Sequence, residues 1–150
     1  MSVYFTCRTQ ISAPSAVVFA AAVSIDAHLN SMSASKEQAI AGVTTGRIGL
    51  GESVTWRARH FGIVWTMTSR ITQFEEPTGF VDEQEHGPFA RFRHVHSFVA
   101  VPGGTVMGDE VAFTAPLGPF GWVAERLALS WYLPRLIRCR NAYLKASIEA

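Results

Sequence analysis

A change of period along the chain is the feature that most constrains its fold. Between residues 52 and 114, apolar and polar residues alternate within successive short segments, so that each segment has one apolar and one polar face. From residue 120 to the C-terminus, apolar residues instead recur at helical spacing. Antiparallel strands with one wet face must bury the other face under a second layer, which the terminal helix can supply. We therefore predict an α+β fold in which a curved antiparallel sheet of about six or seven strands wraps around a long C-terminal helix.

Turn and capping signals divide the rest of the chain. Tight turns are expected at 61–62 and 102–103. Ser12 and Pro14 are typical of a helix start, with the proline in the first turn, and a break near Ser24 divides the following segment into two short helices. The predicted strands cover residues 3–11, 38–44, 52–60, 63–71, 79–86, 87–98 and 105–114.

The C-terminal segment combines an apolar stripe with several arginines. Pro134 is expected to kink this helix. We expect Arg135, Arg138 and Arg140 to form a solvated helix face. The stripe that should face the sheet consists of Phe120, Val123, Leu127, Trp131, Leu136, Arg140, Leu144 and Ile148.

Length and composition restrict the class of protein. The 150 residues suffice for one domain, expected at 1–150, and 48% of them are hydrophobic while 17% are charged. A net charge of +1 without Lys/Arg runs argues against a nucleic-acid partner. No signal-peptide pattern opens the sequence, and no apolar run approaches the roughly 20 residues of a membrane span. We expect a cytoplasmic protein, monomeric or homodimeric.

The two cysteines indicate no metal or redox site. Cys7 and Cys139 lie far apart in the sequence and match no known ligand spacing. We expect both to be buried free thiols in a reducing cytosol.

The segment GPFARFRHVHSF places two histidines toward the interior. Alternation puts Phe92, His94, His96 and Phe98 on one face, because the arginines on the other face require water. A two-residue turn after this strand pairs His96 with Asp109 on the next one. The expected inward polar cluster consists of Asp82, Gln84, His94, His96 and Asp109, together with His60.

Large apolar side chains share the inward face with this cluster. Such residues can form a solid core or line a cavity, and the sequence pattern leaves both possibilities open. They are Trp56, Trp65, Met67, Phe80, Phe92, Phe98 and Phe113.

The order of elements and several motifs resemble one known superfamily. The motifs are GPFARFRHVHSF, the Gly103-Gly104-Thr105 turn, Asp109-Glu110-Val111, and PLGPFGWVAERL before the last helix. Together they resemble the SRPBCC, or helix-grip, superfamily of START lipid-transfer domains, birch-pollen-allergen-like proteins and bacterial polyketide cyclase/dehydrase-like proteins. The likeness covers nearly the whole chain and is closest to small, stand-alone bacterial ligand-binding members. It implies a deep, mainly apolar cavity between sheet and helix for lipids, polyketides or other hydrophobic molecules.

Three roles for the polar cluster remain open. Its members can satisfy one another as a structural network, or they can anchor the polar group of a ligand. They can also act as a general acid and base, with His96 or His94 as the base and Asp109 fixing the tautomer. Two histidines on one strand face are a weak metal signal, so we expect neither a metal nor a cofactor.

Three functions follow for the protein as a whole. Binding of a small hydrophobic ligand in the cavity is the first expectation, with the inward apolar residues as lining and the polar cluster as anchor. A cyclase/dehydrase-type enzyme that uses a His–Asp pair is the alternative. A non-enzymatic interaction protein without a usable cavity is the third.

Overall fold

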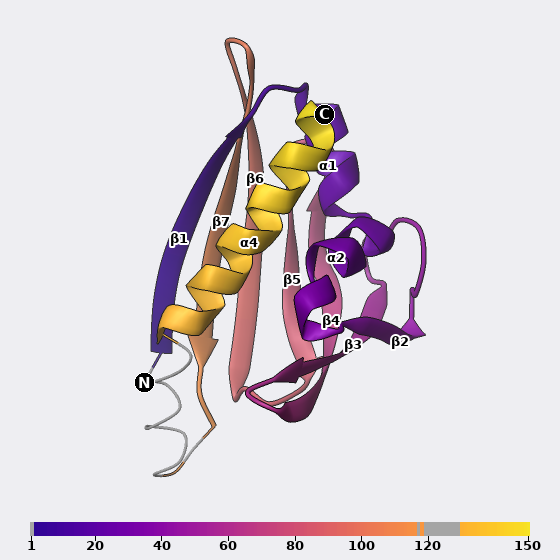
Figure 1. Ribbon diagram of the computed structural model, residues 1–150, viewed down its shortest axis with the longest axis vertical. Coiled ribbons are helices and arrows are strands. Elements are labelled where there is room, and N and C mark those ends of the chain that lie inside the picture. The colour runs from indigo at the N-terminus through magenta and orange to yellow at the C-terminus, as the bar shows by residue number, and fades with distance from the viewer. Residues whose placement is uncertain (1, 117, 119–129) are drawn as a thin grey trace.

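A single antiparallel sheet organises the part of the chain that the computed structural model describes, residues 2–116, 118 and 130–150. It has seven strands in the order β1-β7-β6-β5-β4-β3-β2, so that β1 lies beside the last strand (Figure 1). The strands are β1 (Ser2–Ile11), β2 (Gln38–Gly42), β3 (Ser53–His60), β4 (Ile63–Glu75), β5 (Gly79–His86), β6 (Arg91–Val101) and β7 (Gly104–Thr114).

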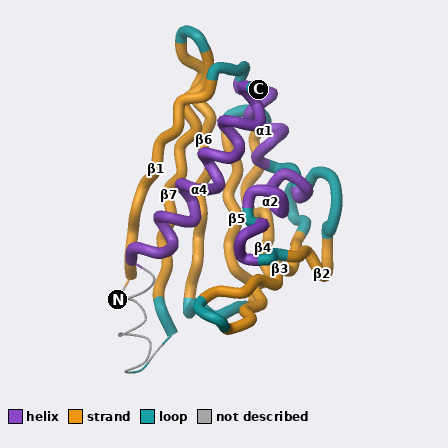
Figure 2. The backbone as a smooth tube through the Cα atoms, viewed as in Figure 1, coloured by secondary structure: helices purple, strands orange, loops and turns teal. Residues whose placement is uncertain are grey.

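All the described helices lie on one face of this sheet. They are α1 (Ser15–Ala22), α2 (Ile25–Ser31), the short 3₁₀ helix η1 (Ser33–Ser35) and α4 (Ser130–Glu149). Figures 1 and 2 show α4 crossing the sheet obliquely, with α1 and α2 beside it. The predicted α+β helix-grip fold is thereby confirmed, including the two short helices after the first strand. Pro119 and the predicted stripe residues Phe120, Val123 and Leu127 lie outside the described residues.

The register of β6 and β7 is the one predicted from the turn at Pro102 and Gly103. His96 lies opposite Asp109 in this ladder, and the turn closes with Val101 opposite Gly104. Gly103 has a φ of 84°, the left-handed conformation that glycine tolerates in such a turn. Because directly opposed residues share a face, the histidines of β6 and the aspartate of β7 point to the same side of the sheet.

The hydrophobic core gathers around Phe19 of α1. Its ring meets those of Phe74, Phe80 and Phe98 edge-on, with centroid separations of 5.3, 5.7 and 5.3 Å. Leu144 of α4 is buried in the same cluster. Residues of α1, α4 and the sheet therefore share one hydrophobic core.

Three local expectations were wrong. Trp131 is exposed rather than part of the buried stripe, because it precedes Leu136 by five residues and so lies roughly 140° around the helix. Cys7 is only half-buried, and Cys139 is exposed because it is on the outer side of α4; both thiols are free. Pro14 is the N-cap residue of α1 rather than a member of its first turn. Pro134, in contrast, does lie inside α4.

Among the described residues, no helix is both long and apolar enough to cross a membrane.

Candidate functional site

A cavity of about 500 Å³ lies between the inner face of the sheet and the helices. This volume falls within the roughly 300–1,000 Å³ that small-molecule sites occupy. Its wall is mainly apolar and comes from α2, strands β3 to β6 and the first half of α4. Phe61 and Trp65, at the turn between β3 and β4, line the cavity and are also 55% and 37% exposed, so they mark its outer rim.

Most of the apolar residues singled out in the sequence line this cavity, and two do not. Phe98 packs in the core against Phe19 and Phe80. Phe113 is buried against Phe89, behind the cavity wall. Those that do line it are Trp56, Trp65, Met67, Phe80 and Phe92.

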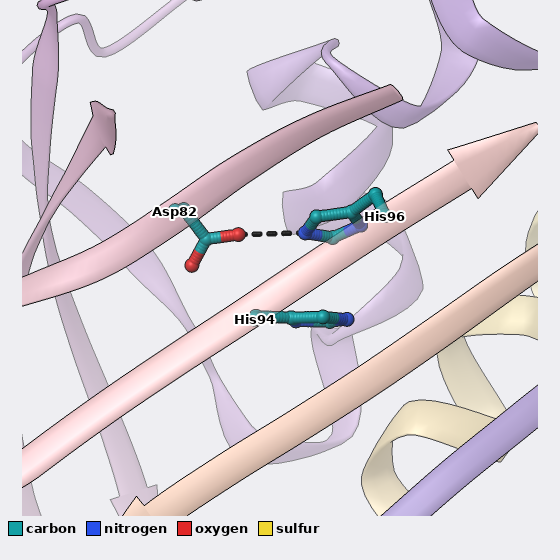
Figure 3. A group of neighbouring side chains, drawn as sticks. All are labelled: Asp82, His94 and His96. Carbon is teal, nitrogen blue, oxygen red and sulfur yellow. Dashed lines mark hydrogen bonds and ion pairs between the residues drawn. The ribbon is translucent and has the colours of Figure 1, made fainter. Parts of the chain in front are cut away.

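Two stacked histidines form one polar part of the wall. The rings of His94 and His96 lie 3.7 Å apart between centroids and nearly parallel, and His96 also stacks on Phe80 at 4.0 Å. Figure 3 shows the two imidazoles projecting side by side from β6, with Asp82 of β5 directed at His96. Both histidines are buried, at 4% exposure.

Asp109 lies behind this wall and is saturated with donors. Its Oδ1 accepts hydrogen bonds from His94 Nε2 at 2.7 Å and from Arg140 Nη2 at 2.9 Å. Its Oδ2 accepts one from Asn141 Nδ2 at 2.6 Å. Burial acts to raise the pKa of Asp109, but the Arg140 charge and the His94 hydrogen bond outweigh it and hold that pKa well below its usual range. Asp109 is therefore an ionised structural centre that joins β7, β6 and α4.

His96 is paired with Asp82, although the residue directly opposite it on β7 is Asp109. The Asp82 Oδ2 to His96 Nε2 distance is 2.6 Å, whereas His96 Nδ1 lies 3.7 Å from Asp109 Oδ1, too far for a hydrogen bond. Burial, reinforced by the proximity of His94, lowers the pKa of His96 to about 4. Burial acts to raise the pKa of Asp82, but the hydrogen bond from His96 lowers it. At neutral pH the carboxylate thus accepts from Nε2–H, and Nδ1 carries a lone pair.

Two buried polar atoms of the cavity wall have no hydrogen-bond partner among the described residues. They are His96 Nδ1 and Ser69 Oγ. Leaving a buried polar group unsatisfied costs about 1–3 kcal/mol, so such atoms call for an explanation.

The other two members of the predicted polar cluster lie elsewhere. The Gln84 amide clamps the 87–90 loop, donating to the carbonyl of Phe89 and accepting from its N–H. His60 lines the cavity near its rim, where its Nδ1 lies 2.8 Å from the Tyr132 hydroxyl of α4. Among the described residues, no hydrogen bond joins either of them to the Asp82–His96 pair.

Arg140 was expected in solvent with Arg135 and Arg138, and for Arg140 that expectation was wrong. Arg135 and Arg138 are at least partly exposed, but Arg140 is buried and faces the sheet. The signal was present in the sequence, because Arg140 occupies a stripe position between Leu136 and Leu144. A charged residue on a buried stripe requires a partner of opposite charge, which Asp109 provides.

A second polar pair on the cavity wall had no counterpart in the sequence analysis. His28 Nε2 of α2 lies 2.7 Å from Glu37 Oε1, and the His28 ring lies tilted against Trp56 with 4.3 Å between centroids. All three residues line the cavity. They come from a helix, a loop and a strand, and no sequence periodicity links them.

The cluster of Asp82, His94 and His96 also has the composition of a metal site. One ligand atom from each lies within 4.8 Å of the others. However, the lone pairs of two stacked imidazoles lie in two separate, nearly parallel ring planes, whereas the ligand lone pairs of one ion must converge on a single point. The buried Arg140 charge beside them further disfavours a cation.

Comparisons with known proteins identify the family of this chain and solved structures with a similar fold. A family described as polyketide cyclase/dehydrase and lipid transport matches residues 3–149. No curated protein matches the sequence.

Solved structures share the fold at low sequence identity. The Zhui aromatase/cyclase from Streptomyces sp. R1128 has a TM-score of 0.79 at 13% identity, covering 99% of this chain and 94% of its own. TTHA0849 from Thermus thermophilus has a TM-score of 0.75 at 15% identity, with 97% and 99% covered. Ara h 8.0201 has a TM-score of 0.61 at 15% identity, with 97% and 99% covered. The chain therefore belongs to the polyketide cyclase/dehydrase and lipid transport family, as its motifs suggested.

Proposed function

We propose that this protein binds a small hydrophobic molecule in the cavity between its sheet and its helices. The observation that supports this proposal best is the combination of an apolar chamber of about 500 Å³ with two unpartnered polar atoms, among the described residues, on its wall. Apolar lining provides affinity by removing ligand surface from water, while a few placed polar groups set orientation. The family's description, which includes lipid transport, is consistent with this function.

A cavity-filling variant tests this proposal. Ala58 of β3 is buried and lines the cavity, whereas its neighbour Arg59 points to solvent. Ala58→Trp should fill much of the chamber, and Arg59→Trp adds the same side chain outside it. In a titration with a fluorescent apolar dye, we expect Ala58→Trp to weaken binding about tenfold or more and Arg59→Trp to leave it unchanged. Equal dye affinity in all three proteins would refute binding in this cavity.

A second candidate function is acid–base catalysis of the cyclase/dehydrase type. The Asp82–His96 pair favours it, because a carboxylate that fixes the Nε2–H tautomer leaves Nδ1 as a base on the cavity wall. In this candidate, His96 rather than His94 takes the proton, and Asp82 rather than Asp109 orients it. His96→Gln should then lower turnover of a β-hydroxycarbonyl substrate by about 10²–10⁴-fold, while dye binding persists. Unchanged turnover in this variant would exclude the role.

A further inference from the structure

We propose that the turn between β3 and β4 docks on an anionic membrane surface and so places the mouth of the cavity against the lipid. The purpose of this docking rests on the proposed binding function, because the lipid phase would be the source of the hydrophobic ligand. The docking itself is measured without any ligand in the cavity. Three features of the described residues support it: an exposed apolar turn, a rim that this turn shares with the cavity, and positive charge beside the turn.

The turn between β3 and β4 exposes a run of large apolar side chains, in the segment Phe61-Gly62-Ile63-Val64-Trp65. Phe61 and Ile63 are each 55% exposed, and Val64 is 44% exposed. A two-residue hairpin turn ordinarily takes Asn, Asp or Gly. Phe61 instead occupies the left-handed conformation, with a φ of 54°, which a bulky side chain adopts only at a cost. Large apolar residues at a strained, exposed turn indicate an interaction surface.

The apolar residues of this turn point in several directions. Ile63 lies opposite His60, on the inner face of the sheet, whereas Val64 lies opposite Arg59 on the outer face. Phe61 is at the tip between them. The turn is therefore a convex wedge, defined by residues 61–65, rather than a flat patch. A flat protein surface would reach one side of this wedge, whereas lipid would surround it.

The same wedge borders the cavity. Phe61 and Trp65 line the cavity and are partly exposed, and the Phe61 ring lies 4.5 Å from that of Tyr132, near the start of α4, between centroids. Tryptophan and tyrosine favour a membrane–water interface, because each combines an apolar ring with one polar group. A wedge seated in lipid would bring the cavity mouth to the lipid phase. An apolar ligand would then enter the cavity without crossing bulk water.

Positive charge without acidic neighbours along the chain flanks the wedge. Residues 53–74 contain three arginines and no aspartate or glutamate. Two of them, Arg57 and Arg59, are exposed on the outer face of β3, and among the described residues neither forms a salt bridge. Arg59 lies directly opposite Val64, and Arg57 is two residues, roughly 7 Å, farther from the tip. Both guanidinium groups can therefore reach the headgroups of anionic lipids when the wedge is inserted.

A second copy of this chain fits the wedge less well than a membrane does. A twofold dimer built on the wedge would bring the arginines of the two copies close together, and like charges repel. An anionic lipid surface supplies the opposite charge, and its shape adapts to a convex tip.

Vesicle binding of matched glutamate variants tests the proposal. The probe is a vesicle of phosphatidylcholine and phosphatidylserine in a two-to-one ratio, with pure phosphatidylcholine as the neutral comparison, and binding is measured by flotation. Val64→Glu adds a carboxylate to the wedge, whereas Val99→Glu adds one to an exposed valine of β6, near the β6–β7 turn at the opposite end of the sheet (Figure 1). We expect Val64→Glu to weaken binding to the anionic vesicles about tenfold or more, and Val99→Glu to change it by less than about twofold. Neither valine lines the cavity, so both variants should bind a fluorescent apolar dye as the wild type does.

A second pair of variants isolates the contribution of charge. Arg59→Gln should weaken binding to the anionic vesicles about fivefold, the factor that one arginine near a charged bilayer contributes, and should leave binding to neutral vesicles unchanged. Arg8→Gln removes the same charge at an exposed position of β1, at the other edge of the sheet, and should change binding by less than about twofold. Equal losses in the two variants would refute the role of Arg59.

The outcomes separate docking from cavity binding. If the wild type binds the dye but not the anionic vesicles, docking on a membrane is refuted while cavity binding stands; a turn that serves an acidic protein partner would give this result. Equal vesicle binding by Val64→Glu and Val99→Glu would refute the assignment of the wedge. A dimer seen by light scattering that Val64→Glu dissociates, without vesicle binding by the wild type, would overturn the proposal in favour of an interface between copies of this chain. Vesicle binding through the wedge without dye binding would refute the proposed function and leave docking in place.

Discussion

Two histidine–carboxylate pairs lie side by side on the sheet, and they differ in how completely they are satisfied. The His94–Asp109 pair belongs to a network in which both carboxylate oxygens accept hydrogen bonds. Two of the donor residues, Arg140 and Asn141, come from α4. The His96–Asp82 pair has one short hydrogen bond, and His96 Nδ1 has no partner among the described residues. Identical residue types, two positions apart on β6, thus face different surroundings.

This difference suggests separate roles for the two pairs, one in stability and one in ligand contact. A buried network with every oxygen satisfied ties the helix to the sheet. A buried nitrogen left open on a cavity wall costs stability unless a ligand meets it. We therefore interpret the Asp109 network as structural and the Asp82–His96 pair as the ligand-contacting part of the cluster.

The largest expected effect comes from breaking the structural network. Asp109→Ala leaves the Arg140 guanidinium buried without its counter-charge, which typically costs about 3–5 kcal/mol. Urea denaturation should show this loss in the free energy of unfolding. Glu110→Ala, on the exposed face of the same strand, is the control and should cost less than about 1 kcal/mol. A similar, small loss in both variants would mean that the network does not hold α4.

Removing His96 should have a smaller effect on stability. His96→Phe retains the stacking surface but deprives the Asp82 carboxylate of its hydrogen bond, which is worth about 1.5–3 kcal/mol. The same urea experiment should therefore rank this variant between Asp109→Ala and the wild type. A loss exceeding that of Asp109→Ala would reverse the assignment of structural and ligand-contacting pairs.

The pH dependence of stability should single out His96. Its pKa falls from an ordinary 6.5 to about 4 in the folded protein, so between these values the unfolded chain binds more protons. The contribution of His96 to the free energy of unfolding should be fully present above pH 6.5 and should decline as the pH falls toward 4. The titratable and charged groups that face His96 are Asp82, His94, Asp109 and Arg140. His96→Phe should show a flatter decline in this window, measured by urea denaturation at several pH values. His60, whose pKa burial also lowers, contributes in the same direction and stays in both proteins. If the free energy of unfolding of the variant depends on pH as steeply as that of the wild type, a group other than His96 titrates in this window.

The smallest expected effect is that of Ser69→Ala. This substitution removes a buried hydroxyl that has no partner among the described residues, so the free energy of unfolding should stay within about 0.5 kcal/mol or rise slightly. Val54→Ala, in the buried core of adjacent β3, serves as the comparison and should destabilise by about 1 kcal/mol or more. A substantial loss in Ser69→Ala would show that this hydroxyl already has a structural role.

Periodicity predicted the fold well because antiparallel strands and an amphipathic helix repeat a simple pattern. The alternation of GPFARFRHVHSF put His94 and His96 inward, and the turn at 102–103 gave the correct register with Asp109. Register does not decide which side chains bond, however. Each carboxylate bonds the histidine diagonal to it rather than the one directly opposite, and the two imidazoles stack on each other.

Contacts between elements distant in the sequence could not be predicted from the sequence pattern. Arg140 was expected in water because the sequence does not show which residue lies opposite it across the helix–sheet interface. In the structure that residue is Asp109. The pair of His28 and Glu37 depends on how α2 sits over Trp56, which no local signal specifies. Phe98 and Phe113 share the inward face with the cavity residues, yet the position of α1 and of the 87–90 loop decides that they pack elsewhere.

Nuclear magnetic resonance of the His96 imidazole tests the central claim most directly. In ¹⁵N-labelled protein at pH 7, the account predicts a proton on Nε2, none on Nδ1, and a shift of the Nδ1 signal when an aromatic alcohol saturates the cavity, while the signals of the exposed His86 stay unchanged. A proton on Nδ1, or a bound aromatic alcohol that leaves the Nδ1 signal in place, would contradict it.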